Sequence, residues 1–129
     1  MDNSFKKSER LNSKKGISIL FEKGKSLFSH PYRAVWIKTE EIQDEVPVQI
    51  MISVSKRNFK KAVDRNKIKR YMREAYRIQK SIIWDAQQDK QYQLQFGLMY
   101  IDKEIRDFDF HQKAMERVLK KLSKEISNK

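Results

Sequence analysis

Cysteine is absent from this sequence, and glycine, proline and histidine are scarce, at three, two and two in 129 residues. The absence of cysteine excludes disulfides, thiol nucleophiles and cysteine-ligated zinc, and it fits a cytoplasmic protein. No apolar run approaches the roughly 18 residues that a membrane-spanning helix needs. Residues 1–7 lead into no apolar segment, so we expect no secretory signal peptide. We therefore expect neither a membrane partner nor a disulfide framework.

Positive charge, by contrast, is abundant. The chain carries 29 Lys and Arg against 17 Asp and Glu, which gives a net charge of +12. Such a balance favours a polyanionic partner over a small-molecule substrate. The length is that of one domain, so we expect a single domain over 1–129, with residues 1–12 as a flexible basic N-terminus.

Most of the net charge lies in one segment, residues 56–80, which holds eleven Lys or Arg and two acids. The basic residues recur at helical spacing and form one stripe: Arg65, Lys69, Arg73, Arg77 and then Lys80. Apolar residues form a second stripe: Ile68, Met72, Ala75 and Ile82. The pattern predicts a helix over 62–83 with one face toward a core and one face that repels itself.

The basic face indicates an anionic partner. Like charges four residues apart destabilise an isolated helix by about 0.2–0.5 kcal/mol per pair. A polyphosphate backbone fits this face, because bound Lys and Arg release condensed counterions. A solvated basic face is the alternative that any charge run allows. The arginine content favours nucleic acid, since the planar guanidinium binds phosphates and base edges through two parallel hydrogen bonds.

The remaining elements follow from shorter patterns. Ser13 can cap a helix that ends at Gly24, with Gly24 in the left-handed conformation that is common just past a helix C-terminus. Three strands are predicted from alternation and apolar runs, over 32–38, 48–55 and 92–101. An apolar stripe at helical spacing predicts a last helix over 109–127.

The connections between these elements indicate the fold class. We interpret the acidic segment 40–45 as an exposed hairpin loop, so the strands on either side are expected to form an antiparallel pair. Residues 84–91 are interpreted as a polar linker. The third strand becomes continuously apolar, as a strand buried on both faces would be. The order α-β-β-α-β-α predicts an α+β two-layer sandwich with helices packed on one sheet.

Side chains suited to catalysis by the protein are not gathered anywhere in the sequence. His30 and His111 have no Asp, Glu or His at metal-ligand spacing. Asp64 lies near a helix start, where an acid is favourable. Glu74 lies four residues from Arg70 and is suited to an ordinary ion pair. We therefore expect no catalytic residue and no metal site in the protein itself.

Three fragments of the central region resemble a known signature. They are Ile-Ser-Val-Ser-Lys-Arg at 52–57, Ala-Val-Asp-Arg-Asn-Lys-Ile-Lys-Arg at 62–70, and Arg-Glu-Ala-Tyr-Arg at 73–77. The bacterial ribonuclease P protein component typically has a strand ending Ser-Val-Ser-Lys-Lys, followed by Ala-Val-x-Arg-Asn-Arg-x-Lys-Arg-x-x-Arg-Glu-x-x-Arg. The first helix, the acidic loop, the third strand and the last helix also fall in family order. The sequence thus resembles this family over nearly its whole length.

The resemblance implies a fold, two partners and a role. The fold would be like domain 2 of ribosomal protein S5, with a rare left-handed βαβ crossover. The partners would be the catalytic RNA of ribonuclease P and precursor tRNA, with no DNA and no small-molecule substrate. The protein would be the non-catalytic subunit of an endoribonuclease. The RNA, with its bound Mg²⁺, would cut precursor tRNA to give the mature 5′ end.

The resemblance also implies residue roles by motif position. Contacts to the catalytic RNA would come from Arg65, Asn66, Lys67, Lys69, Arg70, Arg73 and Arg77. A cleft for the single-stranded 5′ leader would be formed by Ile17, Phe21, Trp36, Ser55, Lys56, Arg57 and Lys60. From the residues alone, Phe21 and Trp36 are each open between core packing and base stacking. Three positions depart from the family pattern: Lys67 replaces an Arg, Ile17 a Phe, and Met51 a Gly.

Three other functions stay open at this point. A ribosomal protein or RNA chaperone with the same sandwich would bind ribosomal RNA and not the ribonuclease P RNA. A protein-only nuclease would cut precursor tRNA without any RNA subunit. A DNA-binding helix protein would prefer duplex DNA to structured RNA at matched salt.

Overall fold

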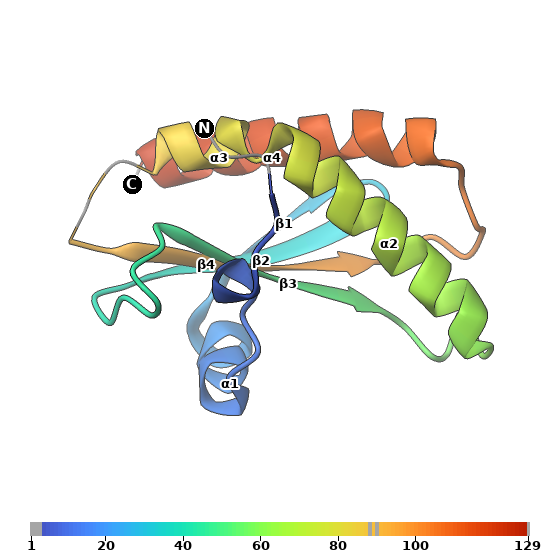
Figure 1. Cartoon of the computed structure of the whole chain (residues 1–129), viewed down its shortest axis with the longest axis horizontal. Coiled ribbons are helices and arrows are strands. Elements are labelled where there is room, and N and C mark those ends of the chain that lie inside the picture. The colour runs from blue at the N-terminus through green and yellow to red at the C-terminus, as the bar shows by residue number, and fades with distance from the viewer. Residues whose placement is uncertain (1–3, 88, 90, 129) are drawn as a thin grey trace.

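The computed structural model describes residues 4–87, 89 and 91–128, and it shows a mixed α+β fold around one four-stranded sheet (Figure 1). The strands are β1 (Lys25–Ser29), β2 (Tyr32–Thr39), β3 (Val48–Val54) and β4 (Gln93–Tyr100). The helices are the 3₁₀ turn η1 (Lys7–Glu9), α1 (Lys14–Lys23), α2 (Ala62–Gln79), α3 (Ser81–Ala86) and α4 (Phe108–Asn128). The predicted helices and strands are all present, with η1, β1 and α3 in addition.

The sheet has the order β1-β2-β4-β3. β2 is antiparallel to β1 and β4, whereas β3 is parallel to β4. The predicted antiparallel pairing of the strands at 32–38 and 48–55 is therefore wrong, because β4 lies between them. β4 takes this central place because nearly all of it is buried, as its continuous apolar run predicts.

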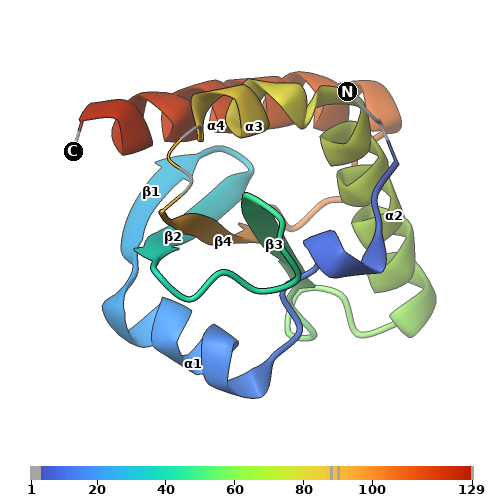
Figure 2. The same ribbon diagram turned by 60° about the vertical axis from the view of Figure 1, so that its left-hand side comes forward.

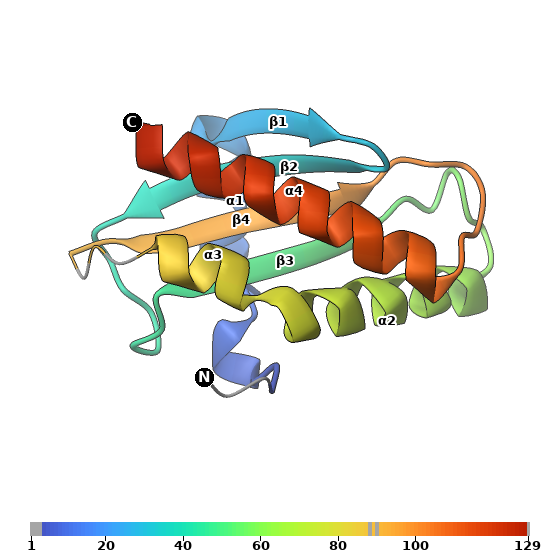
Figure 3. The ribbon, with the colours of Figure 1, turned by 90° about the horizontal axis from the view of Figure 1, so that it is seen from above.

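The parallel pair β3 and β4 is joined through α2 and α3, so the chain contains a βαβ unit. Its left-handed crossover stays a prediction. Seen from above, α2, α3 and α4 cover one face of the sheet, and α1 lies on the opposite face (Figures 1 and 3). The two-layer expectation thus holds for the main layers, and α1 adds a partial third layer.

Strand alternation divides the buried side chains between the two faces. The main core lies between the sheet and the three covering helices, and it includes Tyr32, Ala34, Trp36, Ile68, Met72, Phe96, Val118 and Leu122. A smaller cluster under α1 contains Leu11, Leu20 and Val35. The sheet therefore presents alternate residues of β2 to different helices.

The region between α2 and β4 differs from the predicted helix over 62–83 and linker over 84–91. α2 ends at Gln79, Lys80 joins the two helices, and α3 runs on to Ala86. Trp84, expected in the linker, is helical, and its Nε1 donates to Tyr76 Oη at 3.0 Å. This contact with a buried side chain ties α3 to the core instead of leaving the segment in solvent.

Ser13 and Gly24 bound α1 as predicted, but Gly24 does so for a different reason. Ser13 Oγ accepts from Gly16 N at 3.1 Å, which confirms the N-cap. Gly24 has φ −72°, so it is not in the left-handed region. A Cβ on Gly24 would lie 2.4 Å from Leu20 O and 2.6 Å from Val35 Cγ1. Close approach of the chain to the sheet, and not a positive φ, therefore requires glycine here.

Residues 4–11, part of the N-terminal segment 1–12 that we expect to be flexible, lie against the rest of the protein. Arg10 pairs with Ile50 next to the β3 edge, and Leu11 N donates to Ile50 O at 2.9 Å. Glu9 Oε1 accepts from Lys80 Nζ at 3.0 Å, and the two side chains are only 3% and 2% exposed. A buried ion pair and an added strand-like contact thus hold this segment beside α2.

Candidate nucleic-acid interface

Helix α2 separates a buried face from a basic face, as its pattern predicts. Ile68, Met72, Ala75 and Tyr76 are buried. On the other side Asn66, Lys67, Arg70 and Arg73 are exposed, and Arg65, Lys69 and Arg77 are half-buried. All seven residues assigned to catalytic-RNA contact therefore lie on one helix with side chains that reach solvent.

Lys80 does not belong to this basic face. Its ammonium group is buried, pairs with Glu9 and donates to Ser4 O at 2.6 Å. The Lys80 Nζ also lies 4.5 Å from the centre of the Trp84 ring, a cation–π contact. The predicted continuation of the stripe to Lys80 is therefore wrong, because this side chain turns inward to hold the N-terminal segment.

Arg65 fixes the connector that precedes α2. Its Nη1 donates to Phe59 O at 2.8 Å and to Lys60 O at 2.9 Å. Phe59 is itself buried, with its ring centre 6.0 Å from that of Tyr100. Arg65 therefore fixes the shape of the connector and also belongs to the basic face. Both hydrogen bonds use Nη1, so the Nε and Nη2 donors of the guanidinium take no part in them.

Glu74 forms its ion pair with Arg77. The sequence spacing predicts a pair with Arg70 instead. Arg77 Nη2 lies 2.6 Å from Glu74 Oε2, and Arg77 Nε donates to Glu74 Oε1 at 2.9 Å. The hydrogen bonds from Arg77 hold the pKa of the Glu74 carboxyl below its usual value. The charge of Arg77 is thus locally balanced, and the exposed positive charge of α2 is centred on Arg70 and Arg73.

Arg10 from the N-terminal segment adds a further positive charge near α2. Burial, and next the charge of Arg10, lower the pKa of the Arg73 guanidinium. Both side chains are exposed enough to meet a ligand. Two like charges held near each other attract an anion, so this part of the surface is suited to phosphate.

The residues assigned to the leader cleft fall into two groups. Phe21 on α1 is 45% exposed, and Ile17 packs against the small cluster under α1. Ser55, Lys56, Arg57 and Lys60 are exposed on the connector between β3 and α2. Within the connector, Arg57 N donates to Ser55 Oγ at 3.0 Å, which gives the start of this loop a defined shape.

Trp36 does not join either group. It is 7% exposed and belongs to the main core, on the sheet face opposite α1. Strand alternation instead places its neighbours Val35 and Ile37 on the α1 side. The expectation that Trp36 lines a cleft with Phe21 is therefore corrected, because side chains one position apart on a strand point to opposite faces.

Two residues of this surface were not predicted from the sequence, namely Phe5 and Arg10. The Arg10 Cζ lies 4.9 Å from the Phe5 ring centre, and the Phe5 ring packs edge-on against Tyr76 at 5.5 Å. Apolar Phe5 and Leu11, placed within a basic segment, were the available signal. They indicate a docked segment more than a solvated tail.

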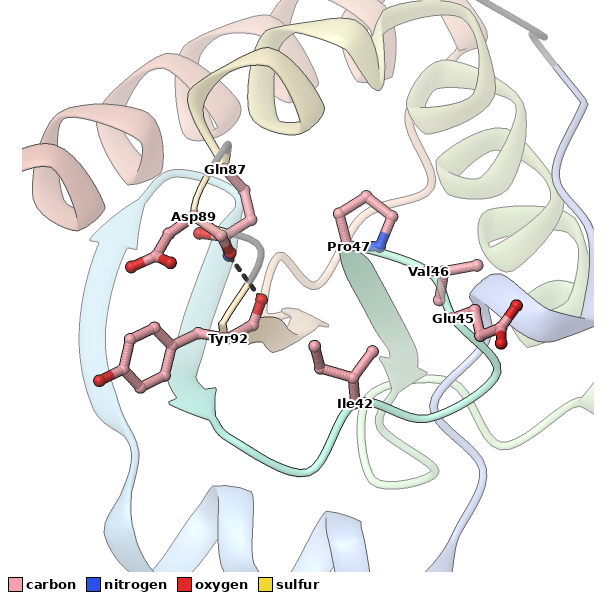
Figure 4. Close-up of a pocket in the computed structure, with 7 residues that line it drawn as sticks. All are labelled: Ile42, Glu45, Val46, Pro47, Gln87, Asp89 and Tyr92. Carbon is pink, nitrogen blue, oxygen red and sulfur yellow. Dashed lines mark hydrogen bonds between the residues drawn. The ribbon is translucent and has the colours of Figure 1, made fainter.

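A pocket of about 720 Å³ lies away from this surface (Figure 4). It opens between the acidic loop and the start of β4, where Gln87 Nε2 donates to Tyr92 O at 3.0 Å. Among the described residues that line it, the charged ones are the acids Glu45 and Asp89. This pocket is therefore poorly suited to a polyanion.

The histidines are explained by structure. His111 is buried, with Nδ1 hydrogen-bonded to Tyr32 Oη at 2.6 Å, and burial lowers its pKa to about 4. His30 Nε2 lies 3.4 Å from Asp102 Oδ2, which also accepts from Arg106. Across residues 4–87, 89 and 91–128, no group of three or more acids, His or Cys could hold a metal ion. Over the same residues, no helix is long and apolar enough to cross a membrane.

Comparison with known proteins agrees with the resemblance. Residues 5–125 match the profile of the Ribonuclease P family. The ribonuclease P protein component of Porphyromonas gingivalis is 34% identical over 113 residues, which cover 88% of this chain and 82% of the relative. That of Chlorobium phaeobacteroides is 32% identical over 126 residues, covering 91% and 86%.

Solved structures show the same fold. The RNase P protein of Staphylococcus aureus superposes with a TM-score of 0.70 at 26% identity, covering 90% of this chain and 96% of that one. The Thermotoga maritima protein gives 0.67 at 24% identity, covering 88% and 96%, and this likeness concerns the fold alone. With the family profile matched over nearly the whole sequence, the chain belongs to the ribonuclease P protein family.

Proposed function

We propose that this chain is the non-catalytic protein subunit of ribonuclease P, which binds the catalytic RNA through α2 and the 5′ leader of precursor tRNA beside α1. The observation that carries the proposal is the exposed row Asn66, Lys67, Arg70 and Arg73, on a helix whose sequence matches the family signature. The holoenzyme would remove the leader to give the mature tRNA 5′ end, in the cytoplasm.

The charge of the protein has a direct physical use in such an assembly. Two RNAs that meet repel each other through their phosphates, and a chain of net charge +12 offsets part of that repulsion. Each phosphate neutralised by Lys or Arg releases condensed counterions, which favours binding. The protein would thus raise the affinity for substrate and lower the Mg²⁺ concentration that the RNA needs.

The Mg²⁺ ions that the reaction requires would be bound mainly by the RNA subunit. Mg²⁺ prefers hard oxygen ligands and keeps several waters, so RNA phosphates suit it. On α2 the acids are Asp64 and Glu74, and Glu74 is bound to Arg77. The residues of the basic helix would therefore hold phosphates, and no nucleophile or general base is assigned to them.

The leader would be held by contacts that tolerate any sequence. Phe21 offers an exposed aromatic face for a base, and Lys56, Arg57 and Lys60 offer charges for phosphates. Stacking of one base on an aromatic side chain contributes about 1–3 kcal/mol. Leader length and charge, more than leader sequence, would then set the affinity.

The test of the leader site compares Phe21→Ala with Ile19→Ala in the assembled holoenzyme. Both residues are exposed apolar side chains of α1, at 45% and 39%. We expect Phe21→Ala to weaken binding of leader-bearing tRNA about 5- to 100-fold, and to leave the affinity for mature tRNA unchanged. Ile19→Ala should leave both affinities unchanged. Equal loss for both tRNAs would contradict the leader assignment.

A further inference from the structure

The docked N-terminal segment forms one wall of a pocket on the basic side of α2. In Figure 2 this segment, drawn in dark blue, runs beside α2 before the chain continues into α1. An open pocket of about 540 Å³ lies between the segment, α2 and the start of α4. Phe5 and Arg10 line it on the segment, and Phe108 lines it on α4. The pocket therefore exists only while residues 4–11 are docked.

The pocket carries a marked excess of positive charge. Among the described residues, four arginines line it: Arg10, Arg70, Arg73 and Arg77. Within the same part of the chain, the acid that lines it is Glu74, and its carboxylate is bound to Arg77. Arg10 and Arg73, which both line the pocket, are close enough for their charges to interact. A ligand that brings one or two negative charges would relieve this repulsion.

The pocket is also strongly apolar, which a run of phosphates alone does not explain. Phe5, Tyr71, Ile78 and Phe108 line it. Ile78 is exposed, and the Tyr71 and Phe108 rings lie 6.1 Å apart. A base-paired RNA stem presents phosphates and sugars to such a surface and keeps its base faces stacked inside. A flat apolar group joined to a phosphate matches the pocket better.

We propose that this pocket receives one unpaired nucleotide of the catalytic RNA, with its base extruded from the stack. The base would lie against Phe5 and the neighbouring apolar wall, and its phosphate would be held by Arg10 and Arg73. Aromatic rings and arginine planes are the groups on which proteins stack extruded RNA bases. The inference rests on the proposed function and adds to it: α2 would bind a specific unpaired position in addition to the backbone.

Base-specific chemical probing of the catalytic RNA, without tRNA, tests this inference directly. We expect one base that reacts with dimethyl sulfate in the free RNA to become protected when the wild-type protein binds. With Phe5→Leu that base should react again, while backbone protection elsewhere persists. This substitution keeps an apolar side chain beside Tyr76 and removes the flat ring. The affinity should fall about 5- to 100-fold.

Phe28→Leu is the matched control, since Phe28 is 52% exposed on β1, at the other edge of the sheet from α2. It should bind the RNA like the wild-type protein. Protection of backbone positions only, or equal affinities for the two Leu variants, would overturn the inference. So would base protection that appears only after precursor tRNA is added. Failure of the wild-type protein to bind the catalytic RNA at all would instead refute the proposed function.

Discussion

The buried ion pair between Glu9 and Lys80 holds the N-terminal segment against the domain, and its removal has a calculable effect. The two side chains are 3% and 2% exposed, and their charged atoms lie 3.0 Å apart. Removing one partner of such a pair leaves the other charge buried without compensation, which costs about 3–5 kcal/mol. Replacing both by neutral groups of similar shape is often close to neutral.

We therefore expect Glu9→Gln and Lys80→Met each to lower the free energy of unfolding by about 3 kcal/mol or more. For a chain of this size the melting temperature would fall by about 10–20 °C. The Glu9→Gln/Lys80→Met double variant should be more stable than the sum of the two losses predicts. A coupling energy of about 2 kcal/mol or more would show that the charges act as a pair.

Urea unfolding of the four proteins measures these differences, and amide hydrogen exchange at Leu11 reports docking of the segment. The Leu11 amide donates to Ile50 O, so it should exchange faster in each single variant. The exposed pair Asp109–Lys113, with a 3.2 Å separation, is the matched control. Its removal should cost at most about 1 kcal/mol. Single variants within 1 kcal/mol of the wild type, or losses that simply add, would refute the reasoning.

Further predictions concern four other positions. Arg70→Ala should reduce the slope of log K against log salt for catalytic-RNA binding by about 0.7–0.9. Arg77→Ala should reduce this slope less, because Glu74 already pairs with Arg77. Equal changes of slope for the two variants in filter-binding titrations would contradict this. Gly24→Ala should destabilise the protein by about 1–3 kcal/mol in urea unfolding, because the added Cβ would lie 2.4 Å from Leu20 O. Unchanged stability would count against the close approach of the backbone at Gly24 to its neighbours. Buried His111 has a folded pKa of about 4 against 6.5 when unfolded, so the unfolded chain binds more protons between these values. Stability should be complete above pH 6.5 and fall toward pH 4 by up to about 1.4 kcal/mol per pH unit, and His111→Gln should flatten that slope in pH-dependent unfolding.

The basic helix could be predicted because its signals are local. The apolar spacing at Ile68, Met72 and Ala75 predicts the buried face of α2, and the structure confirms it. Lys80 follows the same spacing yet is buried, because its partner Glu9 lies 71 positions away in the sequence. Helical periodicity indicates on which face of the helix a residue lies. It contains no information about a charged residue, distant in the sequence, that can pair with the side chain and bury it.

The sheet shows the same limit in another form. Alternation correctly divides β2 into two sets of side chains, but it does not say which set faces α1. The family resemblance placed Trp36 in the cleft, whereas its side chain packs in the main core. The loop between β2 and β3 suggests direct pairing, whereas β4 enters between them from far along the chain. Strand pairing over long sequence separations depends on packing, and loop spacing alone does not encode it. The leader and catalytic-RNA assignments stay predictions.

Cleavage of precursor tRNA at low Mg²⁺ tests the central claim most directly. Three reactions are compared: this protein alone, a bacterial ribonuclease P RNA alone, and the two together. The subunit role predicts leader removal only in the mixture, with the RNA alone becoming active at high Mg²⁺. Cleavage by the protein alone, or no stimulation of an RNA shown to be active at high Mg²⁺, would contradict it.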